Sequence, residues 1–265
     1  MSTKNKIIKC KAAIAWEANK PLSIEEIEVI FNDIFRNIRS EIMDDGKTRF
    51  NCKGKQIFHF VGLSTFSEYA VVREAAVCKA TPLDKVCLIG CGVTTGYGAP
   101  FNSCNVTKGS TVGVGEWVQL AEKFGITDSL NPKNLTGDTK TFVDYIRKKY
   151  EGGFDFTFEA TGNTKAMKEA IDCSKISIGQ TCLIGVTDGD VCINATELVC
   201  FGRTIREYKT RDAMPMLVEK YLKGELPLEK FIDWRFPLIQ INEGIEHLKN
   251  SRGIRSVITV AGDNK

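Results

Sequence analysis

The fold of this chain is decided by the stretch Phe154-Asp155-Phe156-Thr157-Phe158-Glu159-Ala160-Thr161-Gly162-Asn163. Residues 154–159 alternate as a β-strand requires, because successive side chains of a strand point to opposite faces. Asn163 precedes apolar residues at helical spacing within 166–171, and an asparagine at this place can accept hydrogen bonds from the first free N–H groups of a helix. The stretch therefore predicts a strand, a short turn and a capped helix.

Strand-like and helix-like segments alternate on both sides of this stretch. Short apolar segments of the strand type are Thr111 to Val114, Thr181 to Val186 and Ile254 to Val260. Apolar residues at helical spacing lie within 117–124, 142–146, 214–222 and 241–248. Such alternation predicts an α/β fold, in which a parallel sheet is covered by helices.

The N-terminal part of the chain has a different pattern. Residues 7–16 and 66–78 have the apolar, aromatic and β-branched composition of strands, whereas Phe31 to Arg39 carries a short helical stripe. A boundary near residues 100–108 is therefore expected between a β-rich N-terminal part and the α/β part.

Length and composition describe an ordinary globular protein. The chain has 265 residues, of which 43% are hydrophobic and 26% charged, which is enough for a sizeable core in one large or two small domains. The net charge is only +3, and basic clusters such as that in Asp144 to Glu151 have acidic neighbours, which argues against a nucleic-acid surface. Met1 to Lys11 lacks the apolar run of a secretory signal, and no apolar stretch approaches membrane-spanning length, so a cytoplasmic protein is expected.

The cysteines are scattered singly along the chain. Cys78, Cys87, Cys182 and Cys200 lie in apolar runs, and no CxxC pair is present. This distribution is typical of reduced, buried thiols rather than of a disulfide framework.

The segment Gly113-Val114-Gly115-Glu116-Trp117-Val118 has part of the pattern of a dinucleotide-binding loop. The full pattern, GxGxxG, lets the backbone turn tightly and approach a pyrophosphate. Val118 stands at the position of the third glycine, and Asp128, the nearest acid at about the spacing of a ribose-binding carboxylate, lies in a loop-like segment. We interpret Gly113 and Gly115 as a pair of turn glycines.

Three segments together resemble a known family. They are Val86-Cys87-Leu88-Ile89-Gly90-Cys91-Gly92-Val93-Thr94-Thr95-Gly96-Tyr97-Gly98-Ala99, Phe66-Ser67-Glu68-Tyr69 and the stretch at 154–163. The chain resembles the zinc-dependent medium-chain alcohol dehydrogenases of animals. The resemblance implies an α/β fold with an incomplete Rossmann-like parallel sheet and a remnant of a β-rich GroES-like catalytic domain. It implies the domains 1–100 (GroES-like remnant), 101–236 (shortened dinucleotide-binding domain) and 237–265 (return to the catalytic domain).

The resemblance implies zinc as a cofactor, with Cys91 as the matching metal ligand. A catalytic zinc takes three protein ligands and keeps one position open. In the family these are a cysteine and a histidine of the N-terminal domain and the cysteine of a Gly-Cys-Gly segment, and only the last has a counterpart here. His59 and His247 lie in apolar or helical settings, where packing or surface roles are expected instead.

The resemblance also implies NAD as a cofactor. Thr95 matches the threonine that packs on the nicotinamide, Ile184, Gly185 and Val186 match the strand-end segment that contacts its amide, and Arg255 matches a pyrophosphate-binding arginine. The alternative interpretations are a turn threonine, a strand end and a surface charge. The helix after the glycine-rich loop and the second strand of the family have no counterpart between Val112 and Leu120.

The implied function is NAD-linked oxidation of primary or secondary alcohols to aldehydes or ketones. Two zinc ligands, the structural zinc lobe and the glycine-rich loop lack counterparts, so impaired or absent activity is expected. The alternatives are a non-catalytic partner subunit and an unstable, internally shortened product. The family's homodimer is also implied, although its dimer strand is shortened at Gly202 to Lys209.

Overall fold

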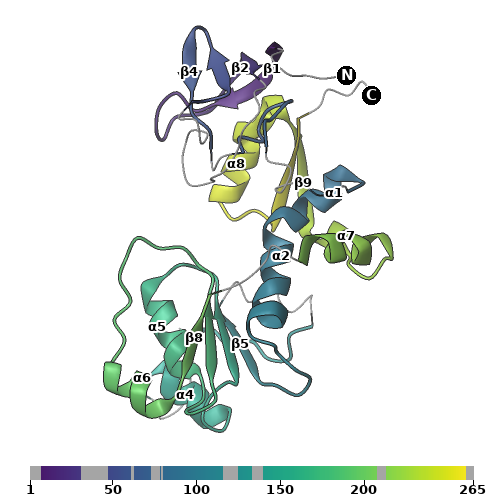
Figure 1. Cartoon of the computed structure of the whole chain (residues 1–265). Helices are drawn as coiled ribbons and strands as arrows, with labels where there is room; N and C mark the ends of the chain where they lie inside the picture. The colour runs from purple at the N-terminus through teal and green to yellow at the C-terminus, as the bar shows by residue number, and fades with distance from the viewer. Residues whose placement is uncertain are drawn as a thin grey trace. The chain divides into compact units, whose positions relative to one another are not determined.

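The computed structural model describes residues 7–30, 47–60, 63–72, 78, 80–115, 125–132, 140–207 and 213–260. The chain divides into two compact units (Figure 1). Unit 1 comprises Met1–Cys87 and Val218–Lys265, and unit 2 comprises Leu88–Leu217.

The secondary structure alternates between strands and helices over most of the chain. The strands are β1 (Ile7–Ile14), β2 (Ser23–Ile30), β3 (Phe50–Cys52), β4 (Lys55–Ile57), β5 (Val112–Gly115), β6 (Phe156–Glu159), β7 (Gln180–Leu183), β8 (Thr204–Arg206), β9 (Ile232–Pro237) and β10 (Arg255–Thr259). The α-helices are α1 (Leu83–Val86), α2 (Gly92–Tyr97), α4 (Phe142–Lys149), α5 (Thr164–Cys173), α6 (Ala195–Phe201), α7 (Met214–Leu222) and α8 (Ile241–Lys249). Shorter helical segments are η2 (Cys87–Gly90), η3 (Gly98–Ser103), η7 (Leu228–Phe231) and η8 (Leu238–Gln240).

Unit 1 contains an antiparallel sheet with the order β1-β2-β3-β4. The pairing of β1 with β2 runs from Ile7 opposite Ile30 to Ile14 opposite Ser23. Every second residue of β1 from Cys10 to Ile14 is buried, and Ile27 and Val29 of β2 are buried beside them. This alternation gives the sheet one apolar face, which forms the core of this part of unit 1.

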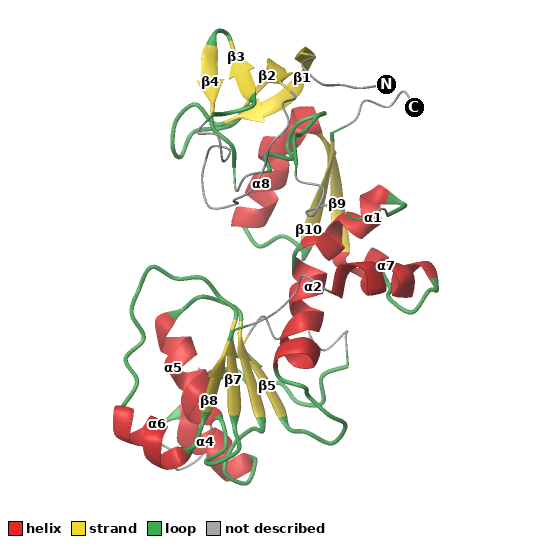
Figure 2. Ribbon diagram, viewed as in Figure 1, coloured by secondary structure: helices red, strands yellow, loops and turns green. Residues whose placement is uncertain are grey.

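Unit 1 also contains β9 and β10, which pair in parallel, and α8, which packs on both strands (Figure 2). The start of α8 is tied to the segment before β2. The Asn242 side chain accepts a hydrogen bond of 2.9 Å from Leu22 N and donates one of 2.8 Å to Leu22 O. These two bonds join residues that are far apart in the sequence.

Unit 2 is built on a parallel sheet with the order β5-β6-β7-β8. Helix α5 packs against β5, β6 and β7, and α4 packs against α5. Thr157 faces this helix, since its Oγ1 donates to Ala170 O at 2.9 Å. Phe158 and Cys182 are buried in a cluster with Ala99 and Cys104, from the segment of η3. Both faces of the sheet are therefore covered, as an α/β fold requires.

The structure confirms the predicted α/β class and most of the predicted elements. The helix after Asn163 is α5, whose first N–H groups, those of Lys165 and Ala166, donate to the Asn163 side chain. The strand predicted over 66–78 is wrong in the described part, where Ser67 forms a single bridge with Ala12. The helices predicted over 31–39 and 117–124 lie outside the described residues.

The predicted domains 1–100, 101–236 and 237–265 stay a prediction. Among the helices that the structure describes, none combines the length and the apolar character that crossing a bilayer requires.

Candidate functional site

The candidate site lies at the carboxyl edge of the parallel sheet of unit 2. Ligands of open α/β sheets bind at this edge, outside the carboxyl ends of the strands. Here β6 ends at Glu159 and β7 at Leu183, and these two residues stand opposite each other in the parallel register. The turns that follow the two strands therefore begin side by side.

Glu159 organises the first of these turns. It is fully buried, with a relative exposure of 0%. Its Oε1 accepts a hydrogen bond of 2.6 Å from Thr161 N and a short one from the Thr161 hydroxyl, and its Oε2 accepts one of 3.2 Å from Gly162 N. The carboxylate thus satisfies the N–H groups that the turn leaves unpaired.

The second turn is held by the main chain of the same residue. The carbonyl oxygen of Glu159 accepts hydrogen bonds from Ile184 N at 2.8 Å and from Gly185 N at 3.0 Å. The bond from Ile184 N continues the parallel ladder, whereas the bond from Gly185 N to the same carbonyl turns the backbone out of the strand. Val186, which follows, has a relative exposure of 91%.

The two turns touch through glycines. A Cβ atom on Gly185 would lie 2.0 Å from Gly162 N, and a Cβ atom on Gly162 would lie 2.3 Å from Val186 O. Gly162 also has a φ of +77°, a left-handed conformation that side chains disfavour. Glycine at both positions permits this close crossing.

Ile184, Gly185 and Val186, predicted to contact a cofactor, lie directly after the carboxyl end of β7. Thr95 is half-buried in α2 of the same unit, and its N–H donates to Cys91 O at 2.9 Å. Arg255 belongs to unit 1, at the start of β10. It is exposed, and its guanidinium donates to Ile254 O at 2.8 Å.

Gly113 and Gly115 lie within β5, so their interpretation as turn glycines is wrong. A Cβ atom on Gly113 would lie 2.6 Å from the Phe154 ring, whereas for one on Gly115 the nearest atom among the described residues would be Phe158 O, at 3.8 Å. Gly113 is thus required for packing within the unit. Asp128 is engaged elsewhere, because it accepts a hydrogen bond of 2.6 Å from the Tyr150 hydroxyl and pairs with Lys149 at 2.5 Å.

Cys91, the predicted zinc ligand, precedes α2 as its N-cap residue and is exposed. Cys87, four residues before it, lies in the separate segment η2. All cysteines of the chain are free thiols, and Cys78, Cys87 and Cys200 are exposed, against the burial expected for them. Among the described residues, no three His, Cys, Asp or Glu side chains gather closely enough to hold a metal ion.

Both histidines of the chain have packing roles in unit 1. His59 is buried, lies 4.6 Å from the Phe50 ring between centroids, and accepts a hydrogen bond of 3.2 Å from Arg49 N through Nε2. Burial and the Arg49 guanidinium lower the pKa of His59 below its usual 6.5. His247 packs edge-on against Trp234 and Phe236, at centroid distances of 4.5 and 5.2 Å.

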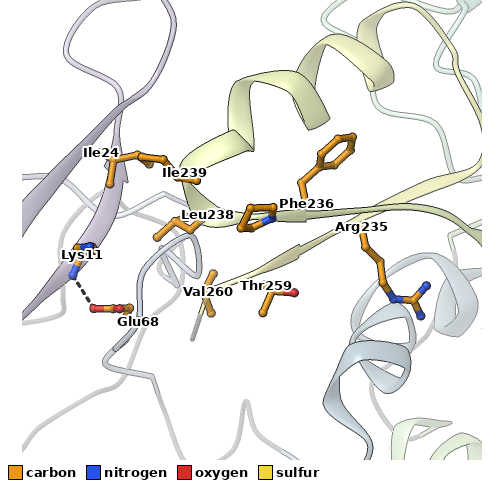
Figure 3. A pocket seen from close by; sticks show the side chains of 10 residues that line it. Lys11, Ile24, Glu68, Arg235, Phe236, Leu238, Ile239, Thr259 and Val260 are labelled. Atoms are coloured by element: carbon orange, nitrogen blue, oxygen red, sulfur yellow. Dashed lines mark hydrogen bonds between the residues drawn. The ribbon is translucent and has the colours of Figure 1, made fainter. Parts of the chain in front are cut away.

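Unit 1 carries a pocket of about 440 Å³ between β1, β2 and the β9–η8 segment (Figure 3). Its wall combines apolar side chains such as those of Ile24 and Leu238 with the polar side chains of Arg235 and Thr259. Glu68, which also lines it, accepts a hydrogen bond of 2.7 Å from Lys11 N. None of the predicted site residues lines this pocket. Volume alone therefore does not identify the candidate site.

Glu159 and Gly162 were not among the predicted site residues. The available signal was an acidic residue at the end of an apolar strand, followed after two residues by a glycine. The alternation of apolar and polar residues alone predicts that a carboxylate in a β segment faces solvent. Its burial depends on a turn that folds back over it.

Comparisons with known proteins identify the family. The sequence profile of the zinc-binding dehydrogenases matches residues 103–222. The chain is 31% identical to the alcohol dehydrogenase class-2 isozyme 2 of Oryctolagus cuniculus, an alignment that covers 97% of this chain and 100% of the relative. It is 30% identical to the alcohol dehydrogenase class-3 of Drosophila melanogaster, with 97% and 99% covered.

The first alignment extends over 381 positions, whereas this chain has 265 residues, so a large part of the relative stands opposite gaps. A solved structure, an alcohol dehydrogenase zinc-binding domain protein from Burkholderia ambifaria, has the same fold. The TM-score is 0.81 at 19% identity, over 97% of this chain and all of the other. By the curated relatives, the chain belongs to the zinc-dependent medium-chain alcohol dehydrogenase family.

Proposed function

We propose that this chain is an alcohol dehydrogenase family member in which zinc-dependent oxidation of alcohols is impaired or lost, while the nicotinamide side of the NAD site is retained. The observation that carries the proposal is the use of both histidines in packing. A catalytic zinc of this family needs an imidazole beside Cys91.

The donor set does not fit a catalytic zinc. His59 binds a backbone N–H through Nε2 and has a lowered pKa in a buried setting, and His247 lies between two aromatic rings. All cysteines lie in the described part of the chain, where none gathers with a histidine and a further ligand. One exposed thiolate holds zinc weakly without partners.

The residues proposed to contact the nicotinamide fit a cofactor better than the possible zinc ligands fit a metal. Ile184, Gly185 and Val186 lie at the sheet edge where α/β proteins bind nucleotides. NAD, when bound, would supply the hydride-accepting ring. The proposed contacts in unit 2 are Thr95 and the main chain of 184–186. That Arg255, in unit 1, binds phosphate stays a prediction, which rests on the suitability of a guanidinium for phosphate geometry.

The substrate class proposed for any residual activity is primary or secondary alcohols and the corresponding aldehydes or ketones. A second candidate function is that of a non-catalytic subunit that pairs with intact relatives. The short β8, at the outer edge of the described sheet, favours it, because an edge strand presents unpaired main-chain groups. A homodimer and a cytoplasmic location stay predictions.

A thermal melt of the purified chain with and without NADH tests the retained cofactor side. A ligand of the native state at about 100 times its Kd adds about 2.7 kcal/mol, which corresponds to a rise in Tm of roughly 5–10 °C for a chain of this size. A cooperative melt whose Tm does not rise with NADH would refute the proposal that the nicotinamide side is retained. It would favour the second candidate function, a non-catalytic subunit. The absence of a cooperative transition would mean that the shortened chain does not fold stably.

A further inference from the structure

We propose that Glu159 is the positioning residue of the cofactor segment: it holds the turns after β6 and β7 together and so fixes the main chain of 184–186. The inference rests on the proposed function, because it assigns the held segment to a nicotinamide cofactor. It goes further by naming the group that sets the segment's conformation.

The Glu159 carboxylate is buried. Glu159 has no exposed surface, although an unpaired buried carboxylate is strongly unfavourable. In the described part of the chain, the hydrogen-bond donors to its two oxygens are Thr161 N, the Thr161 hydroxyl and Gly162 N. The carboxylate is therefore stabilised by the turn, and the turn in exchange is fixed by the carboxylate.

Glu159 binds both turns, one through its side chain and the other through its main chain. The side chain of Glu159 binds the turn at Thr161 and Gly162, while its carbonyl oxygen binds Ile184 N and Gly185 N. A displacement of the side chain would shift the first turn relative to the strand end. The second turn is anchored on that same strand end.

The two turns also contact each other. The space at Gly185 is so limited that a Cβ atom there would also lie 2.9 Å from Glu159 Oε2. The carboxylate, Gly162 and Gly185 are therefore packed directly on one another. Packed groups of this kind transmit displacement, because the interior has no free volume to absorb it.

The consequence is a defined position for the exposed end of the segment. Ile184 packs on the buried cluster that contains Phe158, while Val186 points into solvent with a relative exposure of 91%. A ligand at the sheet edge would meet the main chain at Gly185 and the side chain of Val186. Their geometry before binding depends on Glu159, which makes it a preorganising group.

The test compares Glu159→Gln with Glu169→Gln, a matched control on the outer part of α5 whose side chain is 31% exposed. Glutamine keeps the size of the side chain but replaces one acceptor oxygen by an NH2 group. If the amide oxygen of this glutamine accepts the hydrogen bonds from Thr161, its NH2 group faces the N–H of Gly162, so two donors oppose each other. Glu159→Asp, which keeps the charge on a shorter side chain, is the conservative variant.

The first readout is amide hydrogen exchange without ligand. We expect exchange at 161–163 and at 184–186 to rise about tenfold or more in Glu159→Gln, less in Glu159→Asp, and not in Glu169→Gln. Exchange in β1 and β2 of unit 1 serves as the internal reference. Unchanged exchange at 184–186 in Glu159→Gln would overturn the inference.

The second readout is the increase in Tm with NADH. The wild type and Glu169→Gln should show equal shifts, and Glu159→Gln should need at least several-fold more NADH for the same shift. An equal shift in Glu159→Gln would overturn the inference while leaving the proposed function in place. A wild type that NADH does not stabilise would overturn the proposed function and, with it, the cofactor role of Glu159.

Discussion

Gly162 and Gly185 belong to turns that follow different strands, yet their backbones touch: a Cβ atom on Gly185 would lie 2.0 Å from Gly162 N. The contact lies directly beside the buried Glu159 carboxylate. It sets how the chain leaves the sheet at the edge where nucleotides bind in α/β proteins.

Gly185→Ala should therefore destabilise unit 2 by about 3 kcal/mol, because backbone atoms must move to admit the methyl group. Gly96→Ala is the control, since a Cβ atom there meets no atom of the described residues within 4 Å and α2 gains a better helix former. Urea unfolding followed by a signal from unit 2 measures both. Equal stability of the two variants would contradict the close crossing.

Gly113→Ala should destabilise the protein by about 1–3 kcal/mol without any cofactor, because its methyl group would meet the Phe154 ring. Gly115→Ala should be nearly neutral, since its nearest neighbour among the described residues lies 3.8 Å away. The comparison separates packing from cofactor binding. Should Gly113→Ala leave stability unchanged and weaken NADH binding alone, the packing role would be wrong.

His59 should make the stability of unit 1 sensitive to mild acid. Its pKa is lowered by burial and by Arg49, so between the lowered value and about 6.5 the unfolded chain binds more protons than the native state. Stability is therefore fully present above pH 6.5 and falls as the pH drops through the lowered pKa. Melting curves from pH 7.5 to 5.5 measure this dependence.

His59→Gln is the matched variant for this pH dependence. Its amide oxygen can accept the hydrogen bond from Arg49 N, but it does not titrate. The variant is expected to melt lower at pH 7.5 and to lose less stability on acidification. A pH dependence identical to that of the wild type would show that His59 is not its source.

The cysteines should differ sharply in reactivity. Burial raises the pKa of Cys173 to about 12, whereas Cys91 is exposed. Iodoacetamide at pH 8 should thus modify Cys91 and leave Cys173 unmodified, because the thiolate is the reactive form. Peptide mapping by mass spectrometry measures the alkylation of each cysteine. Added zinc should not protect Cys91 from alkylation. Protection by micromolar zinc would point to a metal site there.

The parts of the fold that depend on neighbouring residues could be predicted from the sequence. Helix α5 is an example, because its cap at Asn163 and its apolar stripe lie within one short segment. Strand β6 was predicted for the same reason, from alternation alone.

The parts that depend on distant residues could not be predicted. Strand β7 ends at Leu183, earlier than its apolar run, because Gly185 N turns back to the carbonyl of Glu159, which Ile184 N already binds. In the sequence, the glycines of β5 resemble turn residues. The reason for Gly113 is the ring of Phe154, which lies against it in the folded chain.

We propose that zinc-dependent catalysis is impaired or lost in this chain although it belongs to a zinc-dependent family. The most direct test measures the zinc content of the purified, dialysed chain together with NADH formation from ethanol and longer primary alcohols. Our account predicts zinc well below stoichiometric amounts and little or no alcohol-dependent NADH formation. Stoichiometric zinc that survives dialysis, together with alcohol-dependent turnover that a chelator abolishes, would contradict it.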